Sequence, residues 1–256
     1  MKNNPEYKIA LLTLPEHMRR ALLEGDWSMF SGQIFSEFTV DTHVKKPHEL
    51  IPGAWFKFCA MDWGYTRPFS IGWYAVNSEG RMVRYKEFYG CKEGEMNIGL
   101  KMGAGEVAKE AWARSVSEGV VDMVADPAIW QKDSENPAIV DYFEQAGFKM
   151  HKANNDRVNG LVVLHERMTT KGHDGIPMFT VWENCYAFIR TIPMLVPSPT
   201  HPEDVDTRLE DHVYDEARYA SMSDFAKFPS RALQRQNGSW RTQKPQEDAY
   251  DPFSMM

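Results

Sequence analysis

The sequence predicts an α/β domain whose mixed sheet, with antiparallel and then parallel strands, is flanked by helices. Three apolar segments separated by turn residues predict an antiparallel meander. Helical and strand-like segments then alternate, which is typical of parallel strands joined by helices. The 256 residues, 43% of them hydrophobic and 25% charged, are enough to bury one sizeable core.

Residues 1–50 are predicted to form a lead-in before the main domain. Pro15 in a first helical turn and Gly25 just past its end predict a short helix over residues 15–23. Gly32–Phe38 is short, with alternating apolar residues, and is expected to be a strand or a docking segment. Two prolines after residue 45 then mark the start of the main domain.

The main domain, residues 51–225, is predicted to continue from the meander into helix–strand units. Its predicted elements are strands over 55–62, 70–76 and 82–88, a helix over 105–118, a strand over 120–126, a helix over 136–146, a strand over 148–151, a helix over 158–168, an extended piece over 178–181, and helices over 183–192 and 209–223. This order is the ribonuclease H-like arrangement. Residues 226–256 are polar and are predicted to be a flexible tail.

Composition excludes several classes of protein. The net charge of −7 argues against a basic nucleic-acid coat protein. Cys59, Cys91 and Cys185 are far apart and form no zinc-binding spacing, so a reducing compartment is expected. No run of 18 apolar residues predicts a transmembrane helix, and the polar N-terminus does not predict a signal peptide.

Three aspartates stand at positions where a carboxylate does little for stability. Asp62 ends the first predicted strand and shares the parity of Phe58, so it should lie on the same face of the sheet. Asp126 ends the fourth strand, and Asp215 lies inside the last helix, where aspartate is a weak helix former. If the two strands are neighbours and the helix packs across their ends, the three carboxylates converge.

Each aspartate also has a purely structural interpretation. Asp62 could cap the turn that follows it, and Asp126 could cap the next segment with Pro127 at its first position. Asp215 could pair with Arg218. Converging carboxylates, however, repel one another unless cations neutralise them. Oxygen ligands favour Mg²⁺ or Mn²⁺, and two such ions can activate water and stabilise the leaving oxygen of a phosphodiester.

Four further residues near these aspartates are weaker candidates. His212 is either a hydrogen-bonded structural histidine or a group that supports a metal ligand and relays protons. Asp211 is either a peripheral metal ligand or a surface acid. Arg157, which begins a predicted helix, and Lys132, which follows the fourth strand, are candidates for contacting DNA phosphates; Lys132 could equally be a solvated loop residue.

Six segments stand out together: LLEGDW (22–27), GQIFSEF (32–38), AMDWGYTRPF (60–69), VADPAIW (124–130), NDRVNGL (155–161) and EDHVYDEARYA (210–220). As a set they resemble the nuclease domain of tailed-bacteriophage terminase large subunits, the enzymes that package viral DNA. Their order and spacing match that family over about residues 6–225. The resemblance implies a ribonuclease H-like fold and a two-metal endonuclease site with Asp62, Asp126 and Asp215 as metal ligands. It also implies concatemeric double-stranded viral DNA as substrate.

The large subunits also contain a packaging ATPase marked by GxxxxGK[ST], and this motif does not occur in the chain. The chain is therefore expected to be the C-terminal part of a large subunit, with residues 1–50 leading from the missing ATPase domain. The family implies that domain, the small terminase subunit and the portal as partners. It implies the cytoplasm of the infected bacterial host as location, transiently at the procapsid portal, with no membrane involved.

Two alternatives stay open from the residues. One is a Holliday-junction resolvase or transposase-type nuclease on the same fold, although the basic DNA-binding face expected of such enzymes is not evident. The other is a non-catalytic docking module for the portal or the small subunit. In that case the seven acids between Glu203 and Glu216 would only solvate a surface.

Overall fold

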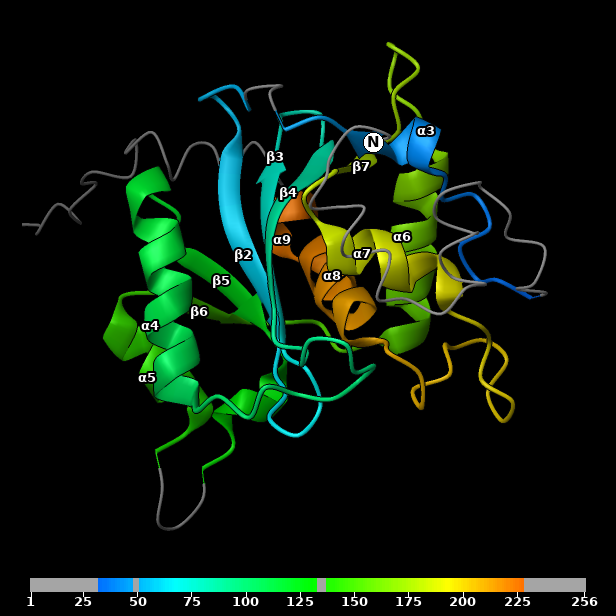
Figure 1. Cartoon of the computed structure of the whole chain (residues 1–256). Coiled ribbons are helices and arrows are strands. Elements are labelled where there is room, and N and C mark those ends of the chain that lie inside the picture. Colours follow the sequence, from blue (N-terminus) through cyan, green and yellow to red (C-terminus); the bar gives the residue numbers. More distant parts are fainter. Residues whose placement is uncertain (1–31, 48–50, 133–136, 228–256) are drawn as a thin grey trace, which may run out of the picture.

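A computed structural model of the chain describes residues 32–47, 51–132 and 137–227. Within these ranges, strands form one mixed sheet in the order β1-β7-β4-β3-β2-β5-β6 (Figure 1). The sheet has an antiparallel part and parallel parts and is flanked by helices, so the predicted fold class is confirmed. The helix predicted over 15–23 and the tail from residue 228 lie outside the described residues.

The predicted meander forms the centre of the sheet. Its strands are β2 (Phe56–Asp62), β3 (Ser70–Val76) and β4 (Met82–Tyr89), paired antiparallel in that order. The turn between β3 and β4 is closed by Asn77, whose Oδ1 accepts hydrogen bonds from two backbone amides of the turn. This turn lies at the opposite end of β3 from Asp62, because Asp62 pairs with Ser70.

Parallel strands extend the sheet on both sides. On one side β5 (Asp122–Ala125) pairs with β2, and β6 (Lys149–Lys152) pairs with β5. On the other side β7 (Phe179–Trp182) pairs with β4. The extended piece predicted over 178–181 is therefore a strand of the main sheet.

Part of the predicted lead-in is packed into this domain. The two-residue strand β1 (Val44–Lys45) pairs parallel with β7 at the sheet edge. Gly32–Phe38 forms turns instead of the strand considered for it, and Phe35 and Phe38 are buried in the core. Burying two aromatic rings stabilises this segment more than pairing a short edge strand would. The limits 1–50, 51–225 and 226–256 themselves stay predictions.

Helices cover both faces of the sheet, with α4 and α5 on one face and α6, α7, α8 and α9 on the other (Figure 1). In chain order the helices are α3 (Val40–His43), α4 (Ala104–Ser115), η1 (Val116–Glu118), η2 (Pro127–Trp130), α5 (Ile139–Ala146), α6 (Arg157–Thr169), α7 (Tyr186–Thr191), η3 (Ile192–Met194), α8 (His212–Met222) and α9 (Asp224–Lys227). Within the described residues the predicted helices agree in place, although α5, α7 and α8 each begin three residues later than predicted. Among the described residues, no helix is both long and apolar enough to cross a bilayer.

The core consists of two hydrophobic clusters, one on each face of the sheet, and β2 contributes to both. Phe56, Phe58 and Ala60 belong to the cluster beneath α8, whereas Cys59 and Met61 belong to the cluster beneath α4 and α5. Asp62 continues the first series, so its side chain is directed to the α8 face. This is the face that its parity in the sequence predicts.

Candidate active site

Two strands and one helix bring the predicted aspartates together at the end of the sheet where β2 and β5 finish. Met61 of β2 pairs with Ala125 of β5 in parallel register, so Asp62 and Asp126 leave the sheet at the same edge. Helix α8 packs against β2, β3 and β5 and carries Asp215 in its first turn. His212 and Tyr219 of the same helix contact Asp62 and Asp126, so the three carboxylates lie around α8.

Asp62 is buried, with 8% of its surface exposed, and it is held by His212 at the start of α8. Its Oδ2 lies 3.1 Å from His212 Nδ1, and His212 Nε2 lies 3.0 Å from Asn97 Oδ1. Asn97 Nδ2 donates to the carbonyl of Leu209, so Asn97 Oδ1 is the atom that accepts from the imidazole. His212 therefore connects a metal-ligand candidate to the loop after β4.

Sequence reasoning did not find Asn97. Its backbone is left-handed, with a φ of 59°, a conformation that asparagine tolerates better than most residues. A turn-forming asparagine in a polar loop carries no signal that would place it beside a histidine on a distant helix. Only the packing of the loop against the residues before α8 shows the contact.

Asp215 is held by two arginines. Arg157, the first residue of α6, directs Nη1 to both carboxylate oxygens, at 3.0 Å from Oδ1 and 2.8 Å from Oδ2. Arg218 donates to Asp215 Oδ1 from Nη2 at 3.0 Å, as the structural interpretation expected. Arg157 Nε also donates to Asp204 at 2.6 Å, and its Nη2 lies 3.6 Å from Asp211.

Asp126 has the capping role considered for it, and its role as a metal ligand stays a prediction. Its Oδ1 accepts from the amide of Ala128 at 2.8 Å and caps η2, with Pro127 in the first turn. Its Oδ2 accepts from the hydroxyl of Tyr219 on α8 at 3.3 Å. The cap fixes where the carboxylate stands, and the tyrosine ties it to the helix that carries Asp215.

Asp211 joins this cluster, but Lys132 does not. Asp211 is the residue before α8, is buried, and interacts electrostatically with Asp215, Asp62 and Arg157. The Lys132 side chain is 72% exposed, and its Nζ is 3.9 Å from Asp141 on α5. The contact of Lys132 with phosphate therefore stays a prediction, without a contact to the carboxylates to support it.

Burial and mutual repulsion both act against the negative charge of this cluster. Burial raises the pKa of Asp62 well above the usual carboxyl range; the hydrogen bond with His212 opposes this, and Asp215 adds to it. Burial likewise raises the pKa of Asp211, and the nearby Asp215 raises it further. Burial lowers the pKa of His212, but the hydrogen bond to Asp62 and the surrounding carboxylates raise it overall. An added cation would be stabilised here.

The carboxylate oxygens of the cluster suit a hard divalent cation, although nitrogens of neighbouring side chains already contact some of them. Within residues 32–47, 51–132 and 137–227, no group of three His, Cys, Asp or Glu side chains is arranged as a metal site. The converging side chains nevertheless offer carboxylate oxygens, the ligands that Mg²⁺ and Mn²⁺ prefer. Arginine and histidine nitrogens occupy the oxygens of Asp215 and Asp62.

Beneath the cluster, a buried ion pair fixes α8 on the sheet. Arg84 of β4 donates to Glu216 at 2.6 Å, and neither side chain is exposed. Ser70 donates to the same oxygen of Glu216, at 3.1 Å. Gly72 leaves the space for this pair, because a Cβ there would lie 2.3 Å from Glu216 Oε1. Since Glu216 follows Asp215, this pair also sets the height of Asp215 above the sheet.

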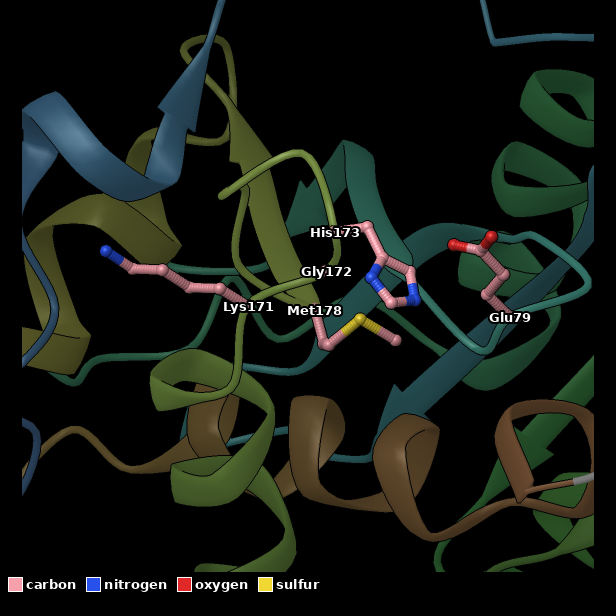
Figure 2. Close-up of a pocket in the computed structure, with 5 residues that line it drawn as sticks. All are labelled: Glu79, Lys171, Gly172, His173 and Met178. Carbon is pink, nitrogen blue, oxygen red and sulfur yellow. The ribbon is translucent and has the colours of Figure 1, made fainter.

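A separate pocket, shown in Figure 2, lies at the ends of the strands away from Asp62. It has a volume of about 310 Å³ and is lined by Glu79, Lys171, Gly172, His173 and Met178. Glu79 belongs to the β3–β4 turn, and Met178 directly precedes β7. Figure 2 shows His173 and Met178 between Lys171 and Glu79. With a single acid in its lining, this pocket lacks the carboxylate convergence of the other edge.

The sheet order and flanking helices define a ribonuclease H-like α/β domain. Its structural neighbours are phage terminase nuclease domains. The P22 large terminase nuclease domain matches with a TM-score of 0.57 and 19% identity, over 78% of this chain and 95% of that chain. The large terminase of the thermophilic bacteriophage D6E matches with a TM-score of 0.59 and 18% identity, over 76% of this chain and 46% of that chain.

These comparisons concern the fold. The chain spans nearly all of the P22 domain and about half of the D6E protein. No family model and no curated protein matches the chain. The structural neighbours confirm the predicted resemblance to terminase nuclease domains.

Proposed function

We propose that this chain contains the nuclease domain of a phage DNA-packaging terminase, a divalent-metal-dependent endonuclease that cleaves phosphodiester bonds of double-stranded viral DNA. One observation carries the proposal. Asp62 and Asp126 stand where β2 and β5 end, and α8, which carries Asp215, contacts both of them, in a fold similar to that of the P22 nuclease domain. Carboxylates brought together at the ends of strands are poorly suited to stabilising a fold and well suited to holding cations.

Each residue of the cluster has a role in this proposal. Asp62, Asp126 and Asp215 would hold two Mg²⁺ or Mn²⁺ ions, with Asp211 at their periphery. When bound, such ions activate water and stabilise the leaving oxygen of a phosphodiester. His212 orients Asp62 through its Nδ1 and is itself held by Asn97.

The substrate and partners follow from the same proposal. The chain is acidic, so DNA binding would be weak and directed to the phosphate backbone, with Lys132 as one contact. Concatemeric viral DNA would be brought to the site by the terminase ATPase domain, the small subunit and the portal. Cutting would then take place in the cytoplasm of the infected host, transiently at the procapsid portal.

Cleavage of supercoiled plasmid in the presence of Mn²⁺ tests this function. Weak, sequence-independent nicking is expected from the wild-type chain. Asp62→Asn should reduce the rate at least about a hundredfold, because it removes a ligand of the metal. Asp174→Asn is the matched control, since it changes an exposed aspartate whose partner is Arg81, and its rate should equal that of the wild type.

Other outcomes would contradict the proposal. Nicking that persists in Asp62→Asn would place the active site elsewhere. Cleavage restricted to four-way junctions would favour a resolvase. No cleavage with any divalent ion, combined with binding to a portal or small subunit, would favour a docking module.

A further inference from the structure

We propose that Arg157 is a built-in cation that neutralises Asp211 and Asp215 in the metal-free protein and leaves this position when a divalent ion binds. This inference rests on the proposed metal site. It adds that the guanidinium of Arg157 competes with the metal ion for the carboxylates of that site.

The contacts of Arg157 place its charge where a metal ion would be needed. One nitrogen, Nη1, faces both oxygens of Asp215, at 3.0 and 2.8 Å. The adjacent Nη2 lies 3.6 Å from Asp211 Oδ2. With the guanidinium in this position, both oxygens of Asp215 accept from Arg157 and its positive charge repels another cation, so metal binding at Asp215 favours the movement of Arg157.

The hold on Arg157 is incomplete, because one of its nitrogens gains no hydrogen bond in this position. Nη2 is buried but has no hydrogen-bond partner, since 3.6 Å is too long for a hydrogen bond. Arg157 is also the first residue of α6, where the positive end of the helix dipole disfavours a cation. The carboxylates therefore hold it against a local repulsion.

An alternative position for the Arg157 side chain lies beside the site. Its side chain is 27% exposed, so Arg157 borders solvent. Its Nε donates to Asp204 at 2.6 Å, on the loop that precedes α8. The contact with Asp204 can keep the arginine beside the site after its other nitrogens have left Asp215. A phosphate approaching the cluster would then find an unpaired fork of donors, the role that the sequence suggested for Arg157.

Arg218, the second partner of Asp215, also has a buried nitrogen without a hydrogen-bond partner, Nη1, but it does not border solvent. Its side chain is fully buried, packs over the ring of Tyr219 and also donates to Asn155. Gly160 of α6 lies against its methylene groups, with no room for a Cβ. Arg218 is therefore a fixed structural partner of Asp215, and Arg157 is the partner that can move.

The affinity for Mn²⁺ tests this inference without relying on catalysis. Binding of Mn²⁺ by the full chain would be measured by calorimetry and by the electron paramagnetic resonance signal of free Mn²⁺. Arg157→Gln should bind Mn²⁺ roughly tenfold more tightly than the wild type, because it removes a competing charge. Arg81→Gln is the control: it removes an arginine that also pairs with an aspartate, at the other end of the sheet, and should not change the affinity.

Arg157→Lys separates charge from packing. It keeps the competing charge, so its affinity should lie closer to that of the wild type than to that of Arg157→Gln. Equal or weaker Mn²⁺ binding by a folded Arg157→Gln, judged by circular dichroism, would overturn the inference and leave the metal site standing. Absence of Mn²⁺ binding in the wild type and in Arg157→Gln alike would remove the proposed metal site as well.

Discussion

Asp62 is oriented by two residues that are distant from it in the sequence. His212 reaches it from α8, and Asn97 holds the other nitrogen of the imidazole from the loop after β4. Because Asn97 also donates to the carbonyl of Leu209, its side chain is fixed on both sides. A carboxylate that must bind a metal in one geometry gains from such a chain of supports.

Asn97→Ala should therefore slow Mn²⁺-dependent plasmid nicking by about tenfold, less than the loss expected for Asp62→Asn. The alanine leaves His212 Nε2 without its acceptor, so that Asp62 is held less firmly. Asn184→Ala is the matched control, because Asn184 also donates from its side chain to a single backbone carbonyl, that of Tyr85. A rate for Asn97→Ala equal to that of the wild type would show that the chain of hydrogen bonds has no part in catalysis.

At the scale of elements, the site depends on how closely α8 approaches its neighbours. Gly160 allows α6 to approach α8, since a Cβ at this position would lie 2.4 Å from Arg218 Cγ. This approach brings Arg157, one helical turn before Gly160, within reach of Asp215. On the sheet side, the buried pair of Arg84 and Glu216 fixes the same helix.

Gly160→Ala should lower the free energy of unfolding by about 1–3 kcal/mol, although alanine is the better helix former. The added methyl group meets the buried stem of Arg218, which has no space to move into. Urea unfolding measures the effect. Val158→Ala, an exposed substitution in the same helix, should change the free energy by less than about 0.5 kcal/mol. A stabilised Gly160→Ala would show that α6 and α8 are less closely packed than this account requires.

Glu216→Gln should cost about 3 kcal/mol of unfolding free energy, because it leaves the buried charge of Arg84 with only Glu87 as an anionic partner. Glu110→Gln, which breaks the exposed pair with Arg114, is the control and should cost less than about 0.5 kcal/mol. Both values come from the same urea titration. Equal costs for the two variants would mean that the buried pair does not anchor α8.

At the scale of the whole molecule, the strand order determines which parts of the site can be foreseen. Asp62 and Asp126 follow buried strands that pair in parallel, so their meeting at one edge could be predicted from strand periodicity. The position of Asp215 could be predicted from a helix that packs across the same strand ends. These expectations depend on local pattern and on a common topology.

The parts that could not be predicted are non-local. The pairs Arg157–Asp215 and Arg84–Glu216 join residues far apart in the chain, and their residue types alone suggest surface charges. The strand β1 is two residues long, too short for any periodicity. Arg157 lies beside Asp215 because α6 packs against α8, and its predicted contact with DNA phosphate stays a prediction.

The folded chain should be stabilised by metal. If Mn²⁺ binds only the folded protein, a concentration of 100 times the Kd adds about 2.7 kcal/mol to the free energy of unfolding. The melting temperature should therefore rise on adding Mn²⁺ and return to its starting value with EDTA. Asp62→Asn should show little of this rise. An equal rise in Asp62→Asn would mean that the ion binds away from the carboxylate edge.

Anomalous diffraction from crystals of the chain soaked in Mn²⁺ tests the central claim most directly. The account predicts anomalous density between Asp62, Asp126 and Asp215, with the guanidinium of Arg157 withdrawn from Asp215 and Arg218 unmoved. Density only at other surface carboxylates, with Arg157 still bound to both oxygens of Asp215, would contradict it.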